Sequence, residues 1–110
     1  MTDTQYVIRS KADQDLDDQA LHYAIKANPE LGHRFLVSAH DTFALLATQP
    51  EMGWHAKLRH PDVRGVRVFR VSGFERILVL YRPLESGIEV LRVVHGSRNV
   101  QRMLRREGIK

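Results

Sequence analysis

Three short segments rich in β-branched and aliphatic residues follow one another in the second half of the chain, at residues 66–71, 77–84 and 88–94. The connections between them are three to five residues long and contain glycine. A parallel crossover needs a dozen residues or more, so these connections fit only hairpin turns. The pattern therefore predicts a three-stranded antiparallel meander. Residues 77–81 are nearly all apolar, which predicts that the middle segment is the central strand.

The first half of the chain has a helical periodicity instead. A first helix is predicted over residues 13–26, with aspartates crowded into its first turns, where the helix dipole favours negative charge. Asn28 and Pro29 are suited to cap and begin a second helix, which we expect to run to residue 48, before Pro50. The apolar positions at helical spacing are Leu16, Ala20, Tyr23, Ala24 and Ala27 in the first helix and Leu31, Phe35, Ala39, Phe43 and Leu46 in the second.

Three further segments complete the predicted fold. Residues 6–9 are typical of a short strand, and the arginine-rich residues 99–110 have the spacing of a short C-terminal helix. Residues 50–62 have no periodicity and contain the only tryptophan, Trp54, so we expect a long loop there. The sequence therefore predicts a single α+β domain over residues 1–110. It has an N-terminal strand, a helical hairpin, the meander and a short C-terminal helix.

Charge is distributed unevenly along the chain. Residues 1–56 carry four Lys and Arg against eight Asp and Glu, whereas residues 57–110 carry thirteen against five. Eleven of those thirteen are arginines, whose planar guanidinium suits phosphate or carboxylate. Two helices can cover only one face of a small sheet, so we expect an open basic face. Its partner would be nucleic acid or an acidic protein segment, unless the surface is simply solvated.

Several classes of protein are disfavoured. The longest apolar runs are five residues, too short to cross a bilayer, and the first ten residues show no secretory signal. The chain has no cysteine, its six histidines show no metal-ligand spacing, and no glycine-rich phosphate loop is present. We therefore expect a cytoplasmic protein with no membrane span, no metal and no cofactor.

An arginine set on the predicted sheet is the strongest chemical feature, and it comprises Arg64, Arg67, Arg70, Arg82, Arg92 and Arg98. Alternation along strands predicts that Arg67 and Arg92 share the open face, with His95 at the end of the last strand. Arginines beside a histidine and a tyrosine are able to cleave RNA without metal, or to bind an acidic peptide. A general nucleic-acid-binding module is disfavoured, because Phe69 and Tyr81 are better placed in the core than in a stacking platform.

Several segments resemble the RelE/ParE toxin superfamily, and its ParE branch (plasmid stabilisation proteins) most closely. The most specific is residues 90–98, VLRVVHGSR, supported by residues 46–53 and by Gly65-Val66-Arg67. The similarity covers residues 6–104. It implies the same fold as the periodicity, and the toxin half of a type II toxin–antitoxin module. Such a toxin is neutralised in a hetero-oligomer by a cognate antitoxin that wraps a disordered segment around it.

The superfamily has two activities. RelE-type toxins cleave mRNA on the ribosome, and ParE-type toxins inhibit DNA gyrase. The resemblance implies that Arg67 and Arg98 occupy the positions of two catalytic arginines of RelE-type toxins. Leu104 occupies the position of their catalytic tyrosine. We therefore favour a gyrase inhibitor with no catalytic residue. A metal-independent, ribosome-dependent mRNA endonuclease that uses Arg67, Arg98 and His95 is the alternative, and an inactive or differently targeted relative is a third hypothesis.

The residues expected to bind the target or the antitoxin are Arg67, Arg70, Arg92, His95, Arg98, Arg102 and Trp54. The expected partners are the cognate antitoxin and DNA gyrase, with the ribosome and mRNA as the alternative.

Overall fold

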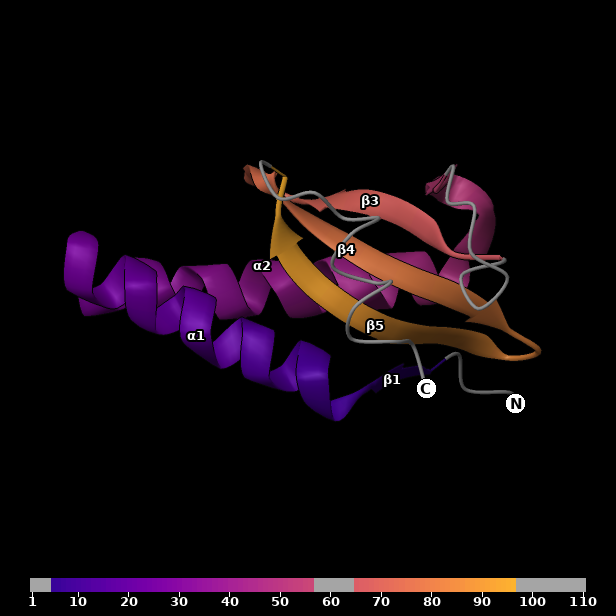
Figure 1. The fold of residues 1–110 in the computed structure, drawn as a ribbon, viewed down its shortest axis with the longest axis horizontal. Coiled ribbons are helices and arrows are strands. Elements are labelled where there is room, and N and C mark those ends of the chain that lie inside the picture. Colours follow the sequence, from indigo (N-terminus) through magenta and orange to yellow (C-terminus); the bar gives the residue numbers. More distant parts are fainter. Residues whose placement is uncertain (1–4, 57–64, 97–110) are drawn as a thin grey trace.

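The computed structural model describes residues 5–56 and 65–96, which form two helices packed on a five-stranded sheet (Figure 1). The elements in chain order are β1 (Tyr6–Ile8), α1 (Ser10–Lys26), α2 (Pro29–Thr48), the 3-10 helix η1 (Pro50–Met52), β2 (Trp54–His55), β3 (Arg67–Val71), β4 (Phe74–Leu84) and β5 (Gly87–His95). The strand order is β1-β5-β4-β3-β2. Strand β1 is parallel to β5, and the other pairs are antiparallel. The predicted α+β class is confirmed.

The sheet is larger than the predicted meander. Strands β3, β4 and β5 are the three expected antiparallel neighbours, and β4 is the central strand, as its apolar run indicated. The segment predicted to be a long loop instead contributes η1 and the two-residue strand β2, which pairs with β3. Two residues are too few to show a strand alternation in the sequence. The predicted C-terminal helix lies outside the described residues.

The helical hairpin follows the predicted boundaries closely. Helix α1 begins three residues earlier than expected, and α2 spans the predicted residues. Asn28 caps α2, because its side-chain oxygen accepts a hydrogen bond from the Leu31 N–H at 2.8 Å. Gly32 allows the two helices to approach each other, since a Cβ there would lie 2.6 Å from the Ala20 carbonyl oxygen.

The main core lies between the helices and the sheet. It includes Phe35 and Phe43 of α2, and Ile77, Val79 and Val90 of the central strands, each at most 1% exposed. Of the five positions predicted to line the buried side of α2, Leu31 is half-buried and the other four are buried. The predicted pattern of apolar residues therefore defines the side of α2 that faces the sheet.

The second face of the sheet differs from the open basic surface predicted from the charge distribution. An apolar cluster occupies it, made of Val66, Val68, Leu80, Leu91 and Val94, and none of these is more than 6% exposed. Alternation directs Val66 and Val68 to this face. Leu91 and Val94 are three residues apart and share it because the pairing of β4 with β5 is irregular beside Leu91. Buried apolar side chains, not arginines, therefore form its centre.

The prediction that Arg92 lies on an open face beside Arg67 is wrong. The Arg92 side chain is 9% exposed, and its guanidinium donates to both carboxylate oxygens of Asp15 in α1, at 2.7 and 3.0 Å. Asp15 also accepts the backbone N–H of Val93 at 2.9 Å. The pairing of β4 with β5 shifts register between Leu80 and Tyr81. This irregularity interrupts the simple alternation on which the prediction depended.

Asp15 also provides a hydrogen-bond acceptor at one edge of the sheet. Strand β1 pairs with β5 only over residues 88–90, so the next part of that edge has no neighbouring strand among the described residues. Asp15, in the second turn of α1, supplies the acceptor there for the Val93 N–H. One carboxylate therefore attaches α1 to the sheet and satisfies an edge amide.

Replacing Asp15 by Ala should lower the free energy of unfolding by about 3 kcal/mol, because it removes the carboxylate from beside a buried guanidinium. Asp17→Ala is the matched control, since Asp17 is exposed on the same helix and should change stability by under about 0.5 kcal/mol. Urea denaturation of both variants measures the difference. Equal losses in the two variants would contradict the role given to Asp15.

Candidate partner-binding site

The segment that follows α2 is attached to the sheet by a buried tyrosine. The Tyr81 hydroxyl donates to the Pro50 carbonyl oxygen at 2.7 Å and accepts the Gly53 N–H at 2.9 Å. A Cβ at position 53 would lie 2.5 Å from the same hydroxyl, so glycine is required by space. Burial raises the pKa of Tyr81, while the Gly53 hydrogen bond and the charge of Arg67 lower it less. The hydroxyl therefore stays neutral and acts as a structural link.

Arg67 binds the same segment from β3. One guanidinium nitrogen donates to the carbonyl oxygens of Gly53 at 2.7 Å and Glu51 at 3.1 Å. The other lies 3.2 Å from Nε2 of His55, which accepts when that nitrogen carries no proton. The sequence predicts that Arg67 binds a partner or a phosphate. In the structure its guanidinium instead holds residues 51–55 in place.

The segment held by Tyr81 and Arg67 presents Trp54 to solvent. The indole is 43% exposed, and the Arg70 guanidinium carbon lies over it, 4.9 Å from the ring centroid. Trp54 pairs with Val68, two residues before Arg70 in β3, so both side chains lie on the same face of the sheet. The structure thus brings together two residues that the sequence proposed separately for binding, in a cation–π contact.

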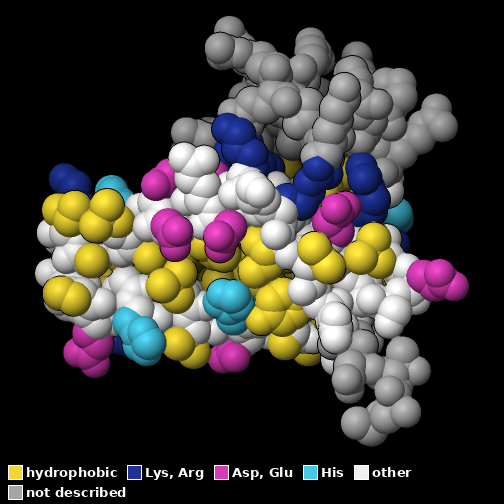
Figure 2. All heavy atoms as spheres, turned by 90° about the horizontal axis from the view of Figure 1, so that it is seen from below, with side chains coloured by type: hydrophobic (Ala, Val, Ile, Leu, Met, Phe, Trp, Pro, Cys, Tyr) yellow, Lys and Arg dark blue, Asp and Glu magenta, His cyan; other side chains and the backbone are white. Residues whose placement is uncertain are grey.

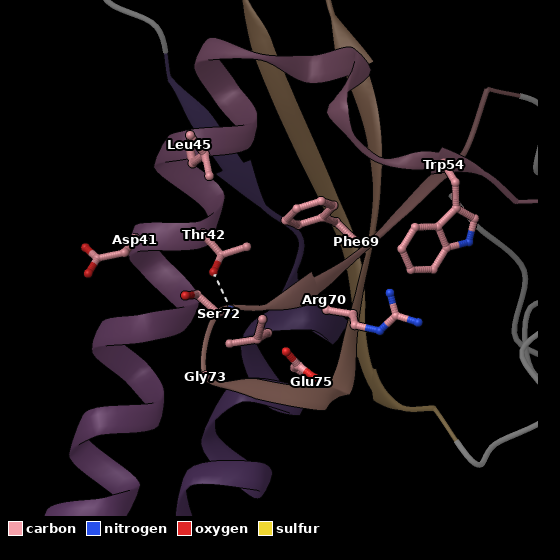
Figure 3. A pocket seen from close by; sticks show the side chains of 10 residues that line it. Asp41, Thr42, Leu45, Trp54, Phe69, Arg70, Ser72, Gly73 and Glu75 are labelled. Atoms are coloured by element: carbon pink, nitrogen blue, oxygen red, sulfur yellow. Dashed lines mark hydrogen bonds between the residues drawn. The ribbon is translucent and has the colours of Figure 1, made fainter.

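A surface hollow of about 490 Å³ adjoins this pair, between α2 and β3 (Figure 3). Besides Trp54 and Arg70, its lining residues are Asp41, Thr42, Leu45, Phe69, Val71, Ser72, Gly73 and Glu75. The Ser72 N–H donates to the Thr42 hydroxyl at 3.1 Å, which connects the β3–β4 turn to α2. In Figure 3 the Arg70 side chain extends toward Trp54 and away from Glu75.

Sequence reasoning missed most of this hollow. The sequence predicts Phe69 in the core, whereas in the structure it is half-buried between the core and the hollow. Leu45 is 44% exposed on α2, one residue from the predicted buried position Leu46. In the sequence, the hollow is signalled only by a leucine that falls outside the predicted buried positions of the helix. That signal does not indicate which strand packs beside the leucine.

The remaining predicted site residues do not join this cluster. His95 ends β5 opposite Ile77, whereas Arg67 begins β3 opposite Tyr81. Those two β4 positions are four residues apart, roughly 13 Å along the strand, and β3 and β5 flank β4 on opposite sides. The structure therefore does not bring Arg67 and His95 together. Arg98 and Arg102 lie outside the described residues.

The face seen from below Figure 1 has a different character (Figure 2). Hydrophobic side chains are exposed there among acidic and histidine side chains, while Lys and Arg gather mainly at one margin. On α1, Leu21 is 58% exposed and Ile25 is 71% exposed. Within the described part of the chain, no group of three or more His, Asp or Glu is arranged to hold a metal. No helix in that part is long and apolar enough to cross a membrane.

Comparison with known proteins identifies the family. The model of the "ParE toxin of type II toxin-antitoxin system, parDE" matches residues 6–100. The chain belongs to the ParE toxin family. The fold is also similar to a solved structure, the chromosomal ParDE toxin–antitoxin system from P. aeruginosa, with a TM-score of 0.69 and 19% sequence identity. That match covers 84% of this chain and 95% of the other. A search of curated proteins found no match.

Family membership confirms the resemblance found in the sequence, including the assignment to the ParE branch. The protein is a ParE toxin of a type II toxin–antitoxin system. The similarity to the P. aeruginosa structure supports the fold of this chain, a helical hairpin on a mainly antiparallel sheet.

Tyr81→Phe should lower the free energy of unfolding by about 1–2 kcal/mol, because it leaves the Gly53 N–H without its acceptor. The size of this difference should depend on pH. The folded pKa of Tyr81 is raised, so its contribution is complete below the unfolded pKa of about 10 and is lost as pH rises toward the folded value. The stability advantage of the wild type should therefore shrink above pH 10.

Urea denaturation of the wild type and Tyr81→Phe at pH 7, 9 and 11 tests both statements. Tyr23→Phe is the control, since burial also raises the pKa of Tyr23, but the Tyr23 ring packs against Phe35 and Phe74 and not against residues 50–55. The fluorescence of Trp54 should change in the folded Tyr81 variant and not in the Tyr23 variant. An unchanged Trp54 signal in Tyr81→Phe would contradict the structural link.

Proposed function

We propose that this ParE toxin inhibits DNA gyrase by protein–protein contact, and so blocks replication, and that a cognate antitoxin neutralises it. Family membership supports the proposal, and the observation that carries it is the use of Arg67. In the nuclease alternative this guanidinium would contact the scissile phosphate. Here it holds the segment that exposes Trp54, which suits a binding protein without chemistry of its own.

Two further observations count against the nuclease alternative. Arg67 and His95 lie on strands that flank β4, at positions separated by roughly 13 Å along it, too far apart to act on one phosphate. The superfamily resemblance also places Leu104 where the nucleases carry a tyrosine, and leucine cannot transfer a proton. Gyrase inhibition needs neither group.

Neutralisation by an antitoxin accounts for features that gyrase alone does not require. The chain is basic overall, with a formal net charge of +4. It also exposes large apolar side chains on several elements, such as Leu21, Ile25 and Trp54. A segment that folds on binding covers apolar surface and pairs charges at the same time. The expected assembly is a toxin–antitoxin hetero-oligomer, and a gyrase target places its action in the cytoplasm.

Expression without the antitoxin should arrest the growth of a bacterial host, because free toxin would block replication. Coexpression with the antitoxin encoded beside it should restore growth. Colony counts after induction, with soluble toxin confirmed on a gel, provide the measurement. Normal growth at confirmed soluble expression would contradict the toxin's activity in that host.

Purified protein should inhibit DNA supercoiling by gyrase and leave mRNA on programmed ribosomes intact. Arg67→Ala should raise the concentration for half-inhibition about tenfold, since it releases the segment that carries Trp54. Arg34→Ala, an exposed change on α2 with the same loss of charge, is the control. Codon-positioned cleavage of mRNA with unaffected supercoiling would establish the nuclease alternative instead.

A further inference from the structure

The apolar cluster on the second face of the sheet is buried, yet no described helix covers it. Its five members, from Val66 to Val94, are at most 6% exposed. The buried apolar side chains of α1 and α2 all belong to the main core on the opposite face. The two further apolar residues that pack against the cluster are Leu78 of β4 and Ala56, which follows β2. An apolar face of a sheet is buried when a second layer packs on it. A part of the chain outside the described residues must therefore supply that layer.

The described chain reaches its last residue beside this cluster. Strand β5 ends at His95, and the Gly96 N–H donates to the Arg76 carbonyl oxygen at 2.7 Å. A Cβ at Gly96 would lie 3.6 Å from the Leu78 side chain, which itself packs against the cluster. The chain therefore leaves β5 on the second face of the sheet, and not on the face that the helices cover.

The residues that follow have the pattern of an amphipathic helix. Val100, Met103 and Leu104 are spaced at i, i+3 and i+4, which places them on one side of a helix. At about 100° per residue, the arginines of the same segment fall on the opposite side. These arginines are Arg98, Arg102, Arg105 and Arg106. The apolar side of such a helix is stable when it packs against an apolar surface.

The length of this segment matches the cluster. Four peptide steps separate Gly96 from Val100, so Val100 lies at most roughly 14 Å from Gly96. The cluster extends over β3, β4 and β5, a width of about 10 Å, and a helix over residues 98–106 is about 13 Å long.

The connection over residues 57–64 is a poorer match. Its two ends are fixed beside β3, where the Ala56 N–H donates to the Val66 carbonyl oxygen at 3.0 Å. Leu91 and Val94 lie two strands away in β5. The segment that begins at Gly96 starts next to those two residues.

We propose that residues 98–106 form an amphipathic helix that docks on the second face of the sheet, where Val100, Met103 and Leu104 cover the apolar cluster. The four arginines of the segment then lie on the outer side of this layer. The basic surface that the charge distribution predicts is thus carried by the docked segment, above an apolar layer, and not by the sheet itself.

A nitroxide label on a single introduced cysteine tests the position of the segment. The chain has no cysteine of its own, so Arg102→Cys is labelled at one site and keeps every apolar residue of the segment. The methyl NMR signals of Leu80 and Leu91 should broaden strongly relative to the reduced label. Those of Leu21 and Ile25, which are exposed on α1, should keep their intensity, because the sheet and the helices separate them from the label by layers of roughly 10 Å each. Broadening of Leu21 and Ile25, or unchanged signals of Leu80 and Leu91, would overturn the proposal.

Substitutions in the full-length toxin test the contact itself. Leu104→Ser should lower the melting temperature by roughly 5 °C or more and increase the fluorescence of an added apolar dye several-fold, because it uncovers part of the cluster. Arg102→Ser is the matched control on the outer side of the same segment, and it should stay within about 2 °C of the wild type without binding more dye. Equal effects of the two substitutions would contradict the docking.

Leu58→Ser tests the connection over residues 57–64 in the same assays. A smaller effect than that of Leu104→Ser is expected, and a larger one would assign the cover to residues 57–64 and overturn the proposal. All of these measurements use the toxin alone. Their outcome is therefore independent of whether the protein inhibits gyrase or binds an antitoxin.

Discussion

The proposed binding site depends on one buried hydroxyl group. Tyr81 lies in the central strand, and its hydroxyl connects Pro50 and Gly53, the residues on either side of the turn that leads to β2. Because a buried N–H or carbonyl without a partner is costly, this link fixes the path of the backbone there. Arg67 adds its hydrogen bonds to the same segment, and the position of Trp54 follows from both. A core residue thereby determines the shape of the surface.

Two of the arginines that the sequence suggested for catalysis or binding have structural partners. Arg67 donates to backbone carbonyls of residues 51 and 53, and Arg92 donates to Asp15. Both contacts join elements that are distant in the chain, so each contributes to the arrangement of the fold. Arg70, which has no such partner among the described residues, stacks on Trp54.

A toxin that acts by contact has different requirements from a nuclease. A nuclease must bring cation, acid and base to one phosphate, whereas an inhibitor needs a rigid surface with exposed aromatic and charged groups. The separation of Arg67 from His95 and the stacked Trp54–Arg70 pair are the observations that favour the proposed inhibitor over a nuclease. Membership in the ParE family is consistent with the proposal that the protein is an inhibitor and not a nuclease.

The helical hairpin, the order of the three long strands and the family can all be predicted from the sequence. These follow from local periodicity, from the cap at Asn28 and from a continuous motif at residues 90–98. Which arginines already have partners within the chain can be seen only in the folded protein. Alternation predicts the face of a side chain only in a regular strand, and the register shift beside Arg92 breaks that rule. Likewise, only the folded chain brings Asp15 to Arg92 and Trp54 to Arg70, because contacts between distant segments leave no periodic trace in the sequence.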